Sequence, residues 1–343
     1  MSYLEEDLNN ISHSEFADQL IGKRILVTGA TGLVGSLLVR NLLRIGSIVY
    51  ALVRNPEKAR VIYGNETDQI HLVKGDITNQ EWCKVFSDDV DYVFHCAAVT
   101  TSKTMVSKPV ETIDTAIAGT KNLLDFSLQH YVKRFVYISS MEVYGTLPSG
   151  DVATEDKLGY IDLFNVRSNY PESKRLCENL CIAYQSEYGL DVVIARLAQT
   201  FGPGVLPWDH RVFAQFAQSV IENENIVLHT RGLSEGNYCY SRDLVKGLFT
   251  ILVRGTSGEA YNVVNEATHT TIADMAEMVV HNIARDRIKV VYDIPKDNSF
   301  GYAADVHLKL SGKKLEDLGW KAEVGLEEMF NRMIEDMKNS KEE

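Results

Sequence analysis

The chain has 343 residues, of which 45% are hydrophobic and 24% are charged, as is usual for a globular protein with a substantial core. Its formal charge of −12, from 47 acidic and 35 basic side chains, argues against nucleic acid or an anionic membrane as partners. The five cysteines are scattered, and neither a signal peptide nor a membrane-spanning apolar run is visible, so we expect a cytoplasmic protein with reduced thiols and no metal site.

The first 22 residues predict a short amphipathic helix that leads into the main fold. After it, apolar β-branched runs alternate with stretches of helical periodicity. The expected strands are 24–28, 47–53, 70–73, 92–96, 134–139 and 192–197, and the expected helices are 33–45, 110–130 and 170–188. This alternation predicts an α/β fold with a doubly wound parallel sheet of the Rossmann type, covered by helices on both faces.

Beyond residue 198 the alternation becomes less regular. The expected elements are helices 213–222, 271–285 and 326–341, a strand at 226–229, a segment from 238 to 254 and a polar loop near 293–304. We expect a smaller, discontinuous C-terminal lobe for the substrate, made of about 199–237 and 263–343. The Rossmann domain would then comprise 23–198 and about 238–262.

A glycine-rich turn follows the first predicted strand and opens the first helix. It reads Gly29-Ala30-Thr31-Gly32-Leu33-Val34-Gly35. Glycines allow a diphosphate to approach the backbone closely, and the N-terminus of a helix offers free N–H groups and a partial positive charge. The order of strand, turn and helix therefore predicts a dinucleotide site, with tight helix–strand packing as the alternative interpretation.

Two further positions concern the dinucleotide. Arg54 stands at the end of the second strand, where a carboxylate would favour NAD and an arginine favours NADP. Asp76, in Gly75-Asp76-Ile77, is placed to accept a hydrogen bond from the adenine amino group, or else to cap a helix at 79–88. NAD and NADP both remain open, although redox-neutral recycling would suit a tightly bound NAD.

The most informative stretch is Tyr170-Pro171-Glu172-Ser173-Lys174. A tyrosine and a lysine four residues apart share one face of a helix. A free phenol titrates near pH 10, so a nearby ammonium and a positively charged nicotinamide would be needed to stabilise its phenolate. Tyr170 would then take a hydroxyl proton while hydride leaves the same carbon. Ser140, at the end of the fifth strand, would orient that hydroxyl.

These motifs stand in the order found in a known family. TGATGLVG at the front, GDI at 75–77, HCAA at 95–98, SSMEVYG at 139–145, YPESK at 170–174 and FGPG at 201–204 resemble the NAD-dependent epimerase/dehydratase branch of the extended short-chain dehydrogenase/reductases. The resemblance runs from about residue 22 to the end of the chain.

The resemblance implies an enzyme that oxidises a nucleotide-linked sugar transiently at C4. It also implies a catalytic triad of Ser140, Tyr170 and Lys174, and a homodimer built on the Tyr170 helix and the long helix before it. The cofactor contacts that it implies include Ile77, Ala97 and Ala98.

Glu142 matches the position where sugar-nucleotide 4,6-dehydratases and UDP-glucuronate decarboxylases carry a glutamate. A ketone at C4 acidifies the hydrogen on C5, which a carboxylate within reach can remove. The alternative is that Glu142 only forms a salt bridge or a cap, as is expected in a simple 4-epimerase. Met141 stands where dehydratases place an acid for the leaving C6 hydroxyl, which favours an epimerase or a decarboxylase.

The expected substrate contacts are Gln199, Arg211, Arg231 and Tyr238. The diphosphate-binding arginine of the family falls at Gly236-Asn237 in this chain, so Arg211, Arg231 or Arg242 would have to supply its charge.

Two other functions fit parts of the sequence. Arg54 favours an NADPH-dependent reductase of a 4-keto sugar or of another carbonyl compound. Ala116, which replaces an asparagine of many relatives, favours a non-catalytic nucleotide-binding protein, as do Met141 and Gly236.

Overall fold

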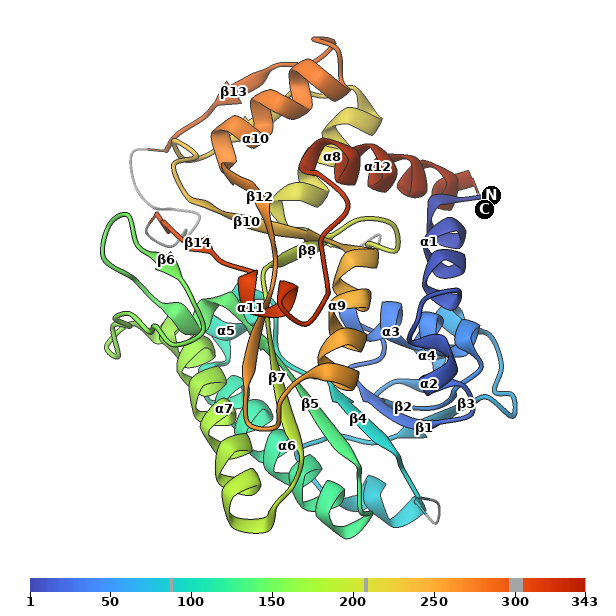
Figure 1. The fold of residues 1–343 in the computed structure, drawn as a ribbon. Helices are drawn as coiled ribbons and strands as arrows, with labels where there is room; N and C mark the ends of the chain where they lie inside the picture. Colours follow the sequence, from blue (N-terminus) through green and yellow to red (C-terminus); the bar gives the residue numbers. More distant parts are fainter. Residues whose placement is uncertain (87–88, 207–208, 296–304, 343) are drawn as a thin grey trace.

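A computed structural model describes residues 1–86, 89–206, 209–295 and 305–342. Seven parallel strands form the main sheet, in the lower half of Figure 1, and they confirm the predicted doubly wound α/β fold. In spatial order the strands are β11 (Ala260–Val263), β7 (Val192–Leu197), β5 (Arg134–Ser140), β4 (Tyr92–His95), β1 (Arg24–Thr28), β2 (Ile48–Val53) and β3 (Ile70–Lys74). The central strands are buried along nearly their whole length, as expected for a parallel sheet with helices on both faces.

Helices cover each face of the main sheet with an apolar layer. On one face pack α3 (Leu33–Ile45) and α9 (Ser241–Arg254). On the other face pack α6 (Pro109–Gln129) and α7 (Asn169–Tyr188), which also contact each other. The sequence pattern did not predict two short helices: α4 (Pro56–Tyr63), between β2 and β3, and α5 (Ser102–Ser107), between β4 and α6. The carboxyl ends of the parallel strands meet at one edge, where ligands bind in such folds.

A second, smaller core lies above the sheet in Figure 1. Its helices are α8 (Val212–Glu222), α10 (Ile272–Met278) with a π-helical turn (Val279–Ile283), and α12 (Leu326–Glu342), and its sheet contains β8 (Gln199–Phe201), β10 (Glu235–Tyr240) and β12 (Asn265–Thr271). The remaining short elements are α11 (Lys313–Glu316) and the strand pairs β9 (Ile226–Leu228) with β13 (Val290–Tyr292), and β6 (Val152–Ala153) with β14 (Lys309–Leu310). The assignment of sequence ranges to two lobes stays a prediction.

The N-terminal segment differs from the single helix that the sequence predicts. It forms α1 (Tyr3–Ser12) and α2 (Ala17–Leu20), separated by a turn. The carbonyl of Asn9 bonds the Ser12 hydroxyl at 2.9 Å and the His13 ring at 2.7 Å. These side chains compete with the helical backbone for that acceptor, which explains why α1 ends there. Of the predicted apolar stripe, Leu8, Ile11, Phe16 and Leu20 are buried, and Leu4 is partly buried.

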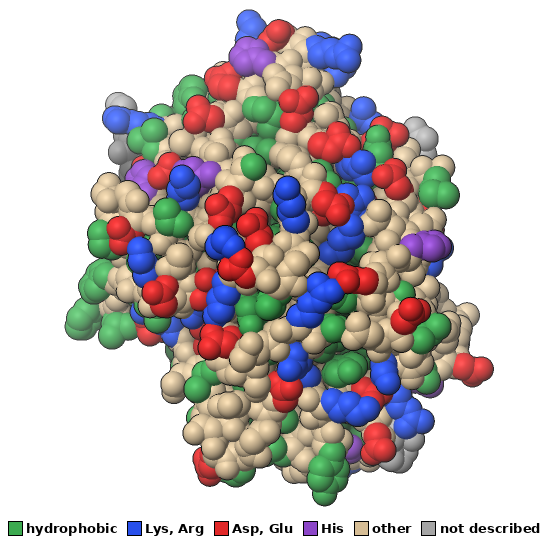
Figure 2. All heavy atoms as spheres, viewed as in Figure 1, with side chains coloured by type: hydrophobic (Ala, Val, Ile, Leu, Met, Phe, Trp, Pro, Cys, Tyr) green, Lys and Arg blue, Asp and Glu red, His purple; other side chains and the backbone are tan. Residues whose placement is uncertain are grey.

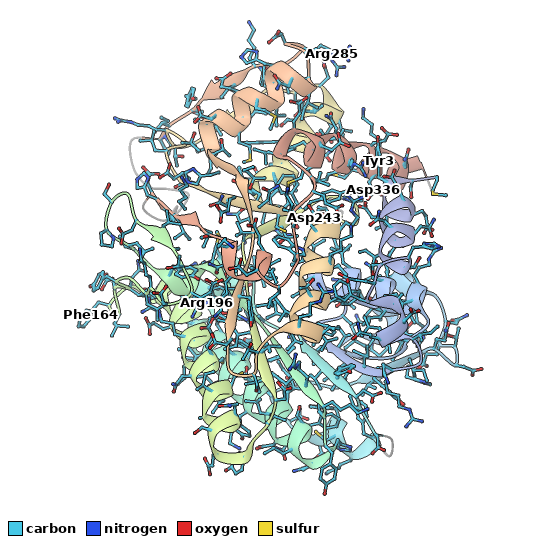
Figure 3. All side chains as sticks on the ribbon, viewed as in Figure 1. Tyr3, Phe164, Arg196, Asp243, Arg285 and Asp336 are labelled. Atoms are coloured by element: carbon cyan, nitrogen blue, oxygen red, sulfur yellow. The ribbon has the colours of Figure 1, made fainter. Side chains whose placement is uncertain are left out.

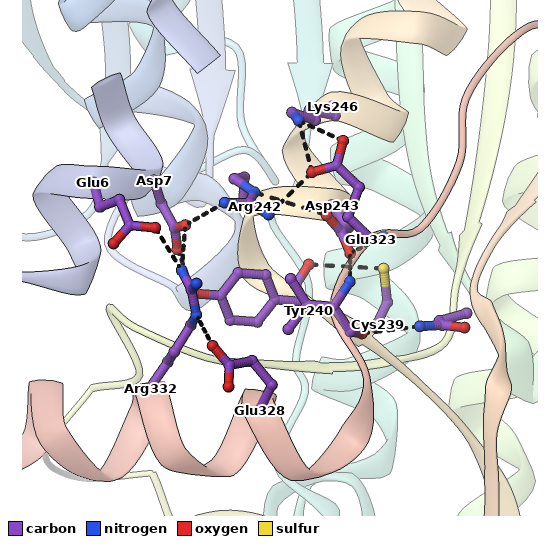
Figure 4. Close-up of polar contacts among 12 residues, drawn as sticks. Glu6, Asp7, Cys239, Tyr240, Arg242, Asp243, Lys246, Glu323, Glu328 and Arg332 are labelled. Atoms are coloured by element: carbon purple, nitrogen blue, oxygen red, sulfur yellow. Dashed lines mark hydrogen bonds and ion pairs between the residues drawn. The ribbon is translucent and has the colours of Figure 1, made fainter. Parts of the chain in front are cut away.

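The first and last helices lie side by side, so the two ends of the chain meet (Figure 1). Asp7 of α1 accepts hydrogen bonds from the Tyr240 hydroxyl at 2.6 Å and from Arg242 Nη1 at 3.2 Å. Arg332 of α12 donates to Glu6 at 3.0 Å (Figure 4). This charged cluster joins α1, α9 and α12 where side chains are largely buried, so its members depend on one another.

The surface carries charges of both signs. On the face in Figure 2, Lys and Arg side chains are interspersed with Asp and Glu rather than gathered in one basic patch. None of the helices in the described part of the chain has the length and apolar character needed to cross a bilayer. The polar loop predicted near 293–304 falls mostly on 296–304, outside the described residues.

Candidate active site

The glycine turn lies between β1 and α3 at the carboxyl edge of the sheet. Gly29 has φ +63°, and a Cβ there would lie 2.8 Å from the backbone of Ala97. A Cβ on Gly35 would lie 2.3 Å from the carbonyl oxygen of Gly29. These two glycines therefore allow α3 and the strand ends to pack closely, which was the alternative interpretation of the motif.

Gly32 has a different environment. It is the exposed N-cap residue of α3, and a Cβ there would meet only the Gly29 carbonyl oxygen, at 3.3 Å. No side chain of the described residues caps α3, so its first N–H groups remain available to an anion. Thr31, Leu33 and Val34 lie partly exposed beside it. The turn thus combines tight packing with an open cradle of N–H groups that fits a dinucleotide diphosphate.

A buried hydrogen-bond chain fixes the neighbouring strand ends. The Thr28 hydroxyl lies 2.9 Å from His95 Nδ1, and His95 Nε2 lies 3.1 Å from the Thr120 hydroxyl. The backbone N–H of Ala97 donates to Thr28 Oγ1 at 3.1 Å. Burial lowers the pKa of His95 to about 3, so its imidazole is neutral and orders the chain. The segment of Ala97 and Ala98 is thereby held beside the glycine turn.

The sequence pattern did not identify Thr28, His95 or Thr120 as a group, because they are far apart along the chain. It also missed Tyr63 of α4, whose buried hydroxyl donates to the Ala30 carbonyl inside the glycine turn. The hydrogen-bond chain through His95 and the bond from Tyr63 hold the backbone around the glycine turn in place.

Asp76 and Arg54 follow adjacent strands and influence each other. Asp76 Oδ1 accepts hydrogen bonds from the Thr78 N–H at 2.9 Å and the Thr78 hydroxyl at 2.7 Å. Burial opposes ionisation of Asp76, but the bonds from Thr78 and the charge of Arg54 outweigh it and lower the pKa of the carboxyl. Asp76 caps a turn, not a helix at 79–88, since the next helix is a 3₁₀ segment at Glu81–Val85. Its contact with adenine stays a prediction.

Ile77, the next residue, is buried against α6. A Cβ on Gly119 of that helix would lie 2.4 Å from Ile77 Cδ1. About one turn earlier in α6, the backbone carbonyl of Ala116 accepts a hydrogen bond from the Cys177 thiol of α7 at 3.3 Å. Gly119 therefore lets α6 pack closely against Ile77, and the Ala116 carbonyl links α6 to α7.

The structure brings the three predicted catalytic residues together. Ser140 ends β5, and Tyr170 lies in the first turn of α7, where the Ser140 side chain is near enough to lower the pKa of the phenol. Lys174, one turn later, donates to the Ile138 carbonyl at 2.7 Å. Its ammonium lies 5.9 Å from the centre of the Tyr170 ring. The lysine therefore lies near the phenol ring, while its recorded hydrogen bond goes to the backbone of β5.

The electrostatics of this triad depend on what else binds there. Burial, with a smaller contribution from Glu142, raises the pKa of Tyr170 to about 12, although the hydrogen bond from Ser140 and the charge of Arg167 oppose this. Burial also lowers the pKa of Lys174. A cation placed beside the phenol would lower its pKa and make it a useful base. In this structure the phenol of Tyr170 is therefore protonated at neutral pH, and its role as a base stays a prediction.

Glu142 forms a salt bridge in this structure. Both of its carboxylate oxygens lie 2.9 Å from Nη2 of Arg167. Arg167 belongs to a 3₁₀ turn (Val166–Ser168) just before α7, and its guanidinium lies 5.5 Å from the centre of the Tyr170 ring. Arg167 is a site residue that no motif indicated, although its position three residues before Tyr170 was a signal. Met141, beside Glu142, offers no acid.

The predicted substrate residues have diverse environments. Gln199 begins β8 and pairs with Tyr238 of β10. Tyr238 is only 3% exposed, and its ring packs edge-on against Phe201. Arg211 contacts Asp209 at 3.0 Å, and Arg231 is exposed between β9 and β10. Their contacts with a substrate stay predictions.

Arg242 does not supply the diphosphate charge that the sequence analysis considered for it. Its side chain is 9% exposed, and it pairs with Asp7 at 3.2 Å and Glu323 at 3.0 Å. A buried arginine engaged in this way stabilises the junction of the terminal helices. The wrong expectation arose because Asp7 and Glu323 are remote from Arg242 in sequence.

The FGPG turn has a structural partner that sequence reasoning missed. The N–H of Gly204 donates to Asp336 Oδ2 of α12 at 2.8 Å, and Asp336 lies at that helix in Figure 3. Gly202, with φ +149°, has no room for a Cβ beside the Tyr240 ring at 2.7 Å. The C-terminal helix is thus tied to the loop that follows Gln199.

The chain is similar to known proteins over most of its length. The model of the NAD dependent epimerase/dehydratase family matches residues 25–264. The chain is 30% identical to UDP-glucuronic acid decarboxylase 6 of Arabidopsis thaliana over 321 residues, covering 92% of this chain and 89% of that protein. It is 29% identical to UDP-glucuronic acid decarboxylase 1 of Danio rerio, covering 94% of this chain and 74% of that protein.

Among solved structures, an epimerase from Methanothermobacter thermautotrophicus has 28% identity and a TM-score of 0.83, with 96% of each chain covered. A UDP-glucose 4-epimerase from Thermotoga maritima, solved with UDP-glucose, has 25% identity and a TM-score of 0.80, covering 92% of this chain and 99% of that one. With its glycine turn, its Ser140-Tyr170-Lys174 triad and these matches over most of its length, the chain belongs to the NAD-dependent epimerase/dehydratase family.

Proposed function

We propose that the protein modifies a nucleotide-linked sugar by transient oxidation at C4, using a bound nicotinamide cofactor. The observation that carries this proposal is the placement of Ser140 at the end of β5 and Tyr170 at the start of α7, with the Lys174 ammonium 5.9 Å from the centre of the Tyr170 ring. A sugar hydroxyl bound between these two side chains would be both oriented and deprotonated there. The similarity to enzymes named for UDP-glucuronic acid and UDP-glucose supports a nucleotide sugar as the substrate class.

Each side chain has a distinct task in this cycle. The N–H groups at the start of α3 would bind the cofactor diphosphate. When bound, the nicotinamide would accept a hydride from C4 and later return it. Ser140 would hold the C4 oxygen, Tyr170 would take the hydroxyl proton and give it back at the end, and Lys174 would favour the phenolate through its charge.

For the step that follows oxidation, we propose decarboxylation of a nucleotide-linked hexuronate. A ketone at C4 stands β to a carboxylate at C6, so the C5–C6 bond can break with its electron pair passing to the C4 oxygen while CO₂ leaves. C5 then takes a proton, and the ketone is reduced again. This route needs no acid for a C6 hydroxyl, in keeping with Met141, and the relatives named UDP-glucuronic acid decarboxylases support it.

A 4-epimerase is the second candidate. In that reaction the ketone is reduced from the opposite face, and Glu142 needs no free carboxylate. The salt bridge between Glu142 and Arg167 favours it, as does the similarity to the UDP-glucose 4-epimerase.

One incubation separates the candidates. The purified protein is given UDP-glucuronate or UDP-glucose without added cofactor, and the products are resolved by liquid chromatography and mass spectrometry. We expect UDP-glucuronate to lose CO₂ and UDP-glucose to remain unchanged. Conversion of UDP-glucose to an isomer of equal mass would instead identify the epimerase. Consumption of free NADPH by a 4-keto sugar would identify a reductase, and no turnover of any substrate would support a binding protein.

The choice between NAD and NADP depends on Arg54. Its side chain is exposed just after β2, where an arginine would contact a 2′-phosphate, and this supports NADP. The cofactor released on denaturation can be identified by mass spectrometry. If NADP is bound, Arg54→Ala should weaken NADP binding at least about tenfold and leave NAD binding nearly unchanged.

We also propose a homodimer formed by α6 and α7. These adjacent helices carry exposed apolar side chains, among them Val110, Ile113 and Leu176. Light scattering should give a dimer mass, and Leu176→Asp should shift the protein toward the monomer.

A further inference from the structure

We propose that Arg167 is a specificity-determining residue, which allows the site to accept a negatively charged group at C6 of the sugar. The inference rests on the proposed function, since it concerns the sugar part of the same site. In this proposal Arg167 supplies the positive charge that balances Glu142 and the anionic group of the sugar.

The position of Arg167 is the first support. Its Nη2 lies 2.9 Å from both oxygens of Glu142, two residues after Ser140. Its guanidinium also lies 5.5 Å from the centre of the Tyr170 ring. The same cation therefore borders the carboxylate that follows β5 and the phenol that begins α7.

The hydrogen-bonding capacity of Arg167 is the second support. A guanidinium has five N–H donors in a planar fork. Arg167 has one acidic partner among the described residues, which is Glu142. Both its hydrogen bond and its ion pair to Glu142 use Nη2. With 23% of the side chain exposed, Arg167 is not fully enclosed, and the described residues show no hydrogen bond from its Nε or Nη1. An arginine can thus contact two carboxylates at once, which a lysine does less well.

Charge balance is the third support. A hexuronate carboxylate bound near C5 would approach Glu142, and two carboxylates without a cation between them repel each other. Arg167 compensates the charge of Glu142 and leaves the local site able to take one more anion. A neutral C6 hydroxymethyl group has no such requirement, so its binding should depend little on Arg167.

The test measures binding rather than turnover. Isothermal titration calorimetry follows UDP-glucuronate and UDP-glucose binding to the wild type, Arg167→Gln, Arg167→Lys and the double variant Glu142→Gln/Arg167→Gln. Each protein also carries Tyr170→Phe, so that the sugar is bound with little turnover. Lys133→Gln is the matched control, because it removes one positive charge at the amino end of β5, far from Ser140 at the carboxyl end. Thermal unfolding confirms that each variant is folded.

We expect Arg167→Gln to weaken UDP-glucuronate at least about tenfold and to change UDP-glucose less than about twofold. The double variant should recover part of the lost affinity, because removal of the Glu142 charge relieves the repulsion. Arg167→Lys keeps the positive charge and should keep a preference for the anionic sugar. If Arg167→Gln is unstable, this variant can still be compared with the wild type.

Equal losses for both nucleotide sugars in Arg167→Gln, or no loss for either, would overturn the role of Arg167 while leaving the proposed function intact. If the wild type binds neither nucleotide sugar, the proposed function itself fails, and the role of Arg167 fails with it.

Discussion

The Ser139 hydroxyl donates a 2.5 Å hydrogen bond to Oε1 of Glu178, linking the end of β5 to the middle of α7. Glu178 is paired in turn with Arg196 of β7 at 2.7 Å, and Arg196 donates to the Tyr144 hydroxyl at 3.2 Å. Arg196 lies inside the molecule beside α7 (Figure 3). The residues next to Ser140 and Lys174 are therefore held by one buried network, which the sequence pattern did not reveal.

We expect Arg196→Met to be strongly destabilising. The side chains of Arg196 and Glu178 are 7% and 10% exposed, so the substitution would leave a buried carboxylate without its partner. Loss of one member of such a pair costs about 3–5 kcal/mol. Urea unfolding measures this loss, and Arg196→Met with Glu178→Leu should be less destabilised than the single variant. A single variant as stable as the wild type would contradict the role of the network.

Tyr170→Phe should abolish most of the activity without unfolding the protein. The substitution removes the proton-accepting oxygen but retains the ring. Since general base catalysis contributes about 10²–10⁴-fold, we expect kcat to fall by roughly 10³-fold. Product formation is measured by mass spectrometry, with bound cofactor and the thermal midpoint as controls. Normal turnover by this variant would exclude the proposed proton transfer.

The glycine turn offers a matched pair of substitutions. Gly32→Ala adds a methyl group at the exposed N-cap of α3, so we expect near-normal stability and cofactor affinity reduced at least about tenfold. Gly35→Ala places its methyl group 2.3 Å from the Gly29 carbonyl oxygen and should destabilise the fold as well. Cofactor titration and urea unfolding separate the two effects. Unchanged affinity in Gly32→Ala would place the diphosphate elsewhere.

Asp7 should make stability depend on pH. Burial raises the pKa of its carboxyl to about 6, partly offset by the Tyr240 hydroxyl and by Arg242 (Figure 4). Because the folded value exceeds the unfolded value of 3.8, the stabilisation is fully present below that pH and is lost as pH rises through about 6. The loss approaches roughly 3 kcal/mol. Urea unfolding of the wild type and Asp7→Asn across this range measures it. The wild type should lose stability relative to Asp7→Asn as pH rises. A free energy of unfolding of the wild type that, relative to Asp7→Asn, stays constant or increases with pH would contradict the shift.

The sequence was most informative where one local pattern determines structure. The strands at 24–28 and 192–197 have the predicted bounds, because continuous apolar runs between helices permit little else in a parallel sheet. The glycine turn and the spacing of Tyr170 and Lys174 likewise indicated the candidate site, since each motif spans only a few consecutive residues. The strands β6 and β14, of two residues each, have too little sequence for any periodicity.

What the sequence missed depends on contacts between distant residues. Asp7 and Tyr240 are 233 positions apart, so no local pattern links them, and Arg242 was wrongly considered for the diphosphate. Arg167 and Glu142 are separated by 25 positions across an irregular segment. Only the fold shows that Glu142 is paired, which changes the charge expected at the site.

The most direct test of transient oxidation at C4 uses a nucleotide sugar deuterated at that carbon. Purified protein is incubated with C4-deuterated UDP-glucuronate without free cofactor, and the product is analysed by mass spectrometry and NMR. If the hydride taken from C4 is returned after the C5–C6 bond breaks, the product keeps deuterium at C4, and Tyr170→Phe yields almost no product. A product that has lost this deuterium, or that forms equally well with Tyr170→Phe, would contradict the mechanism.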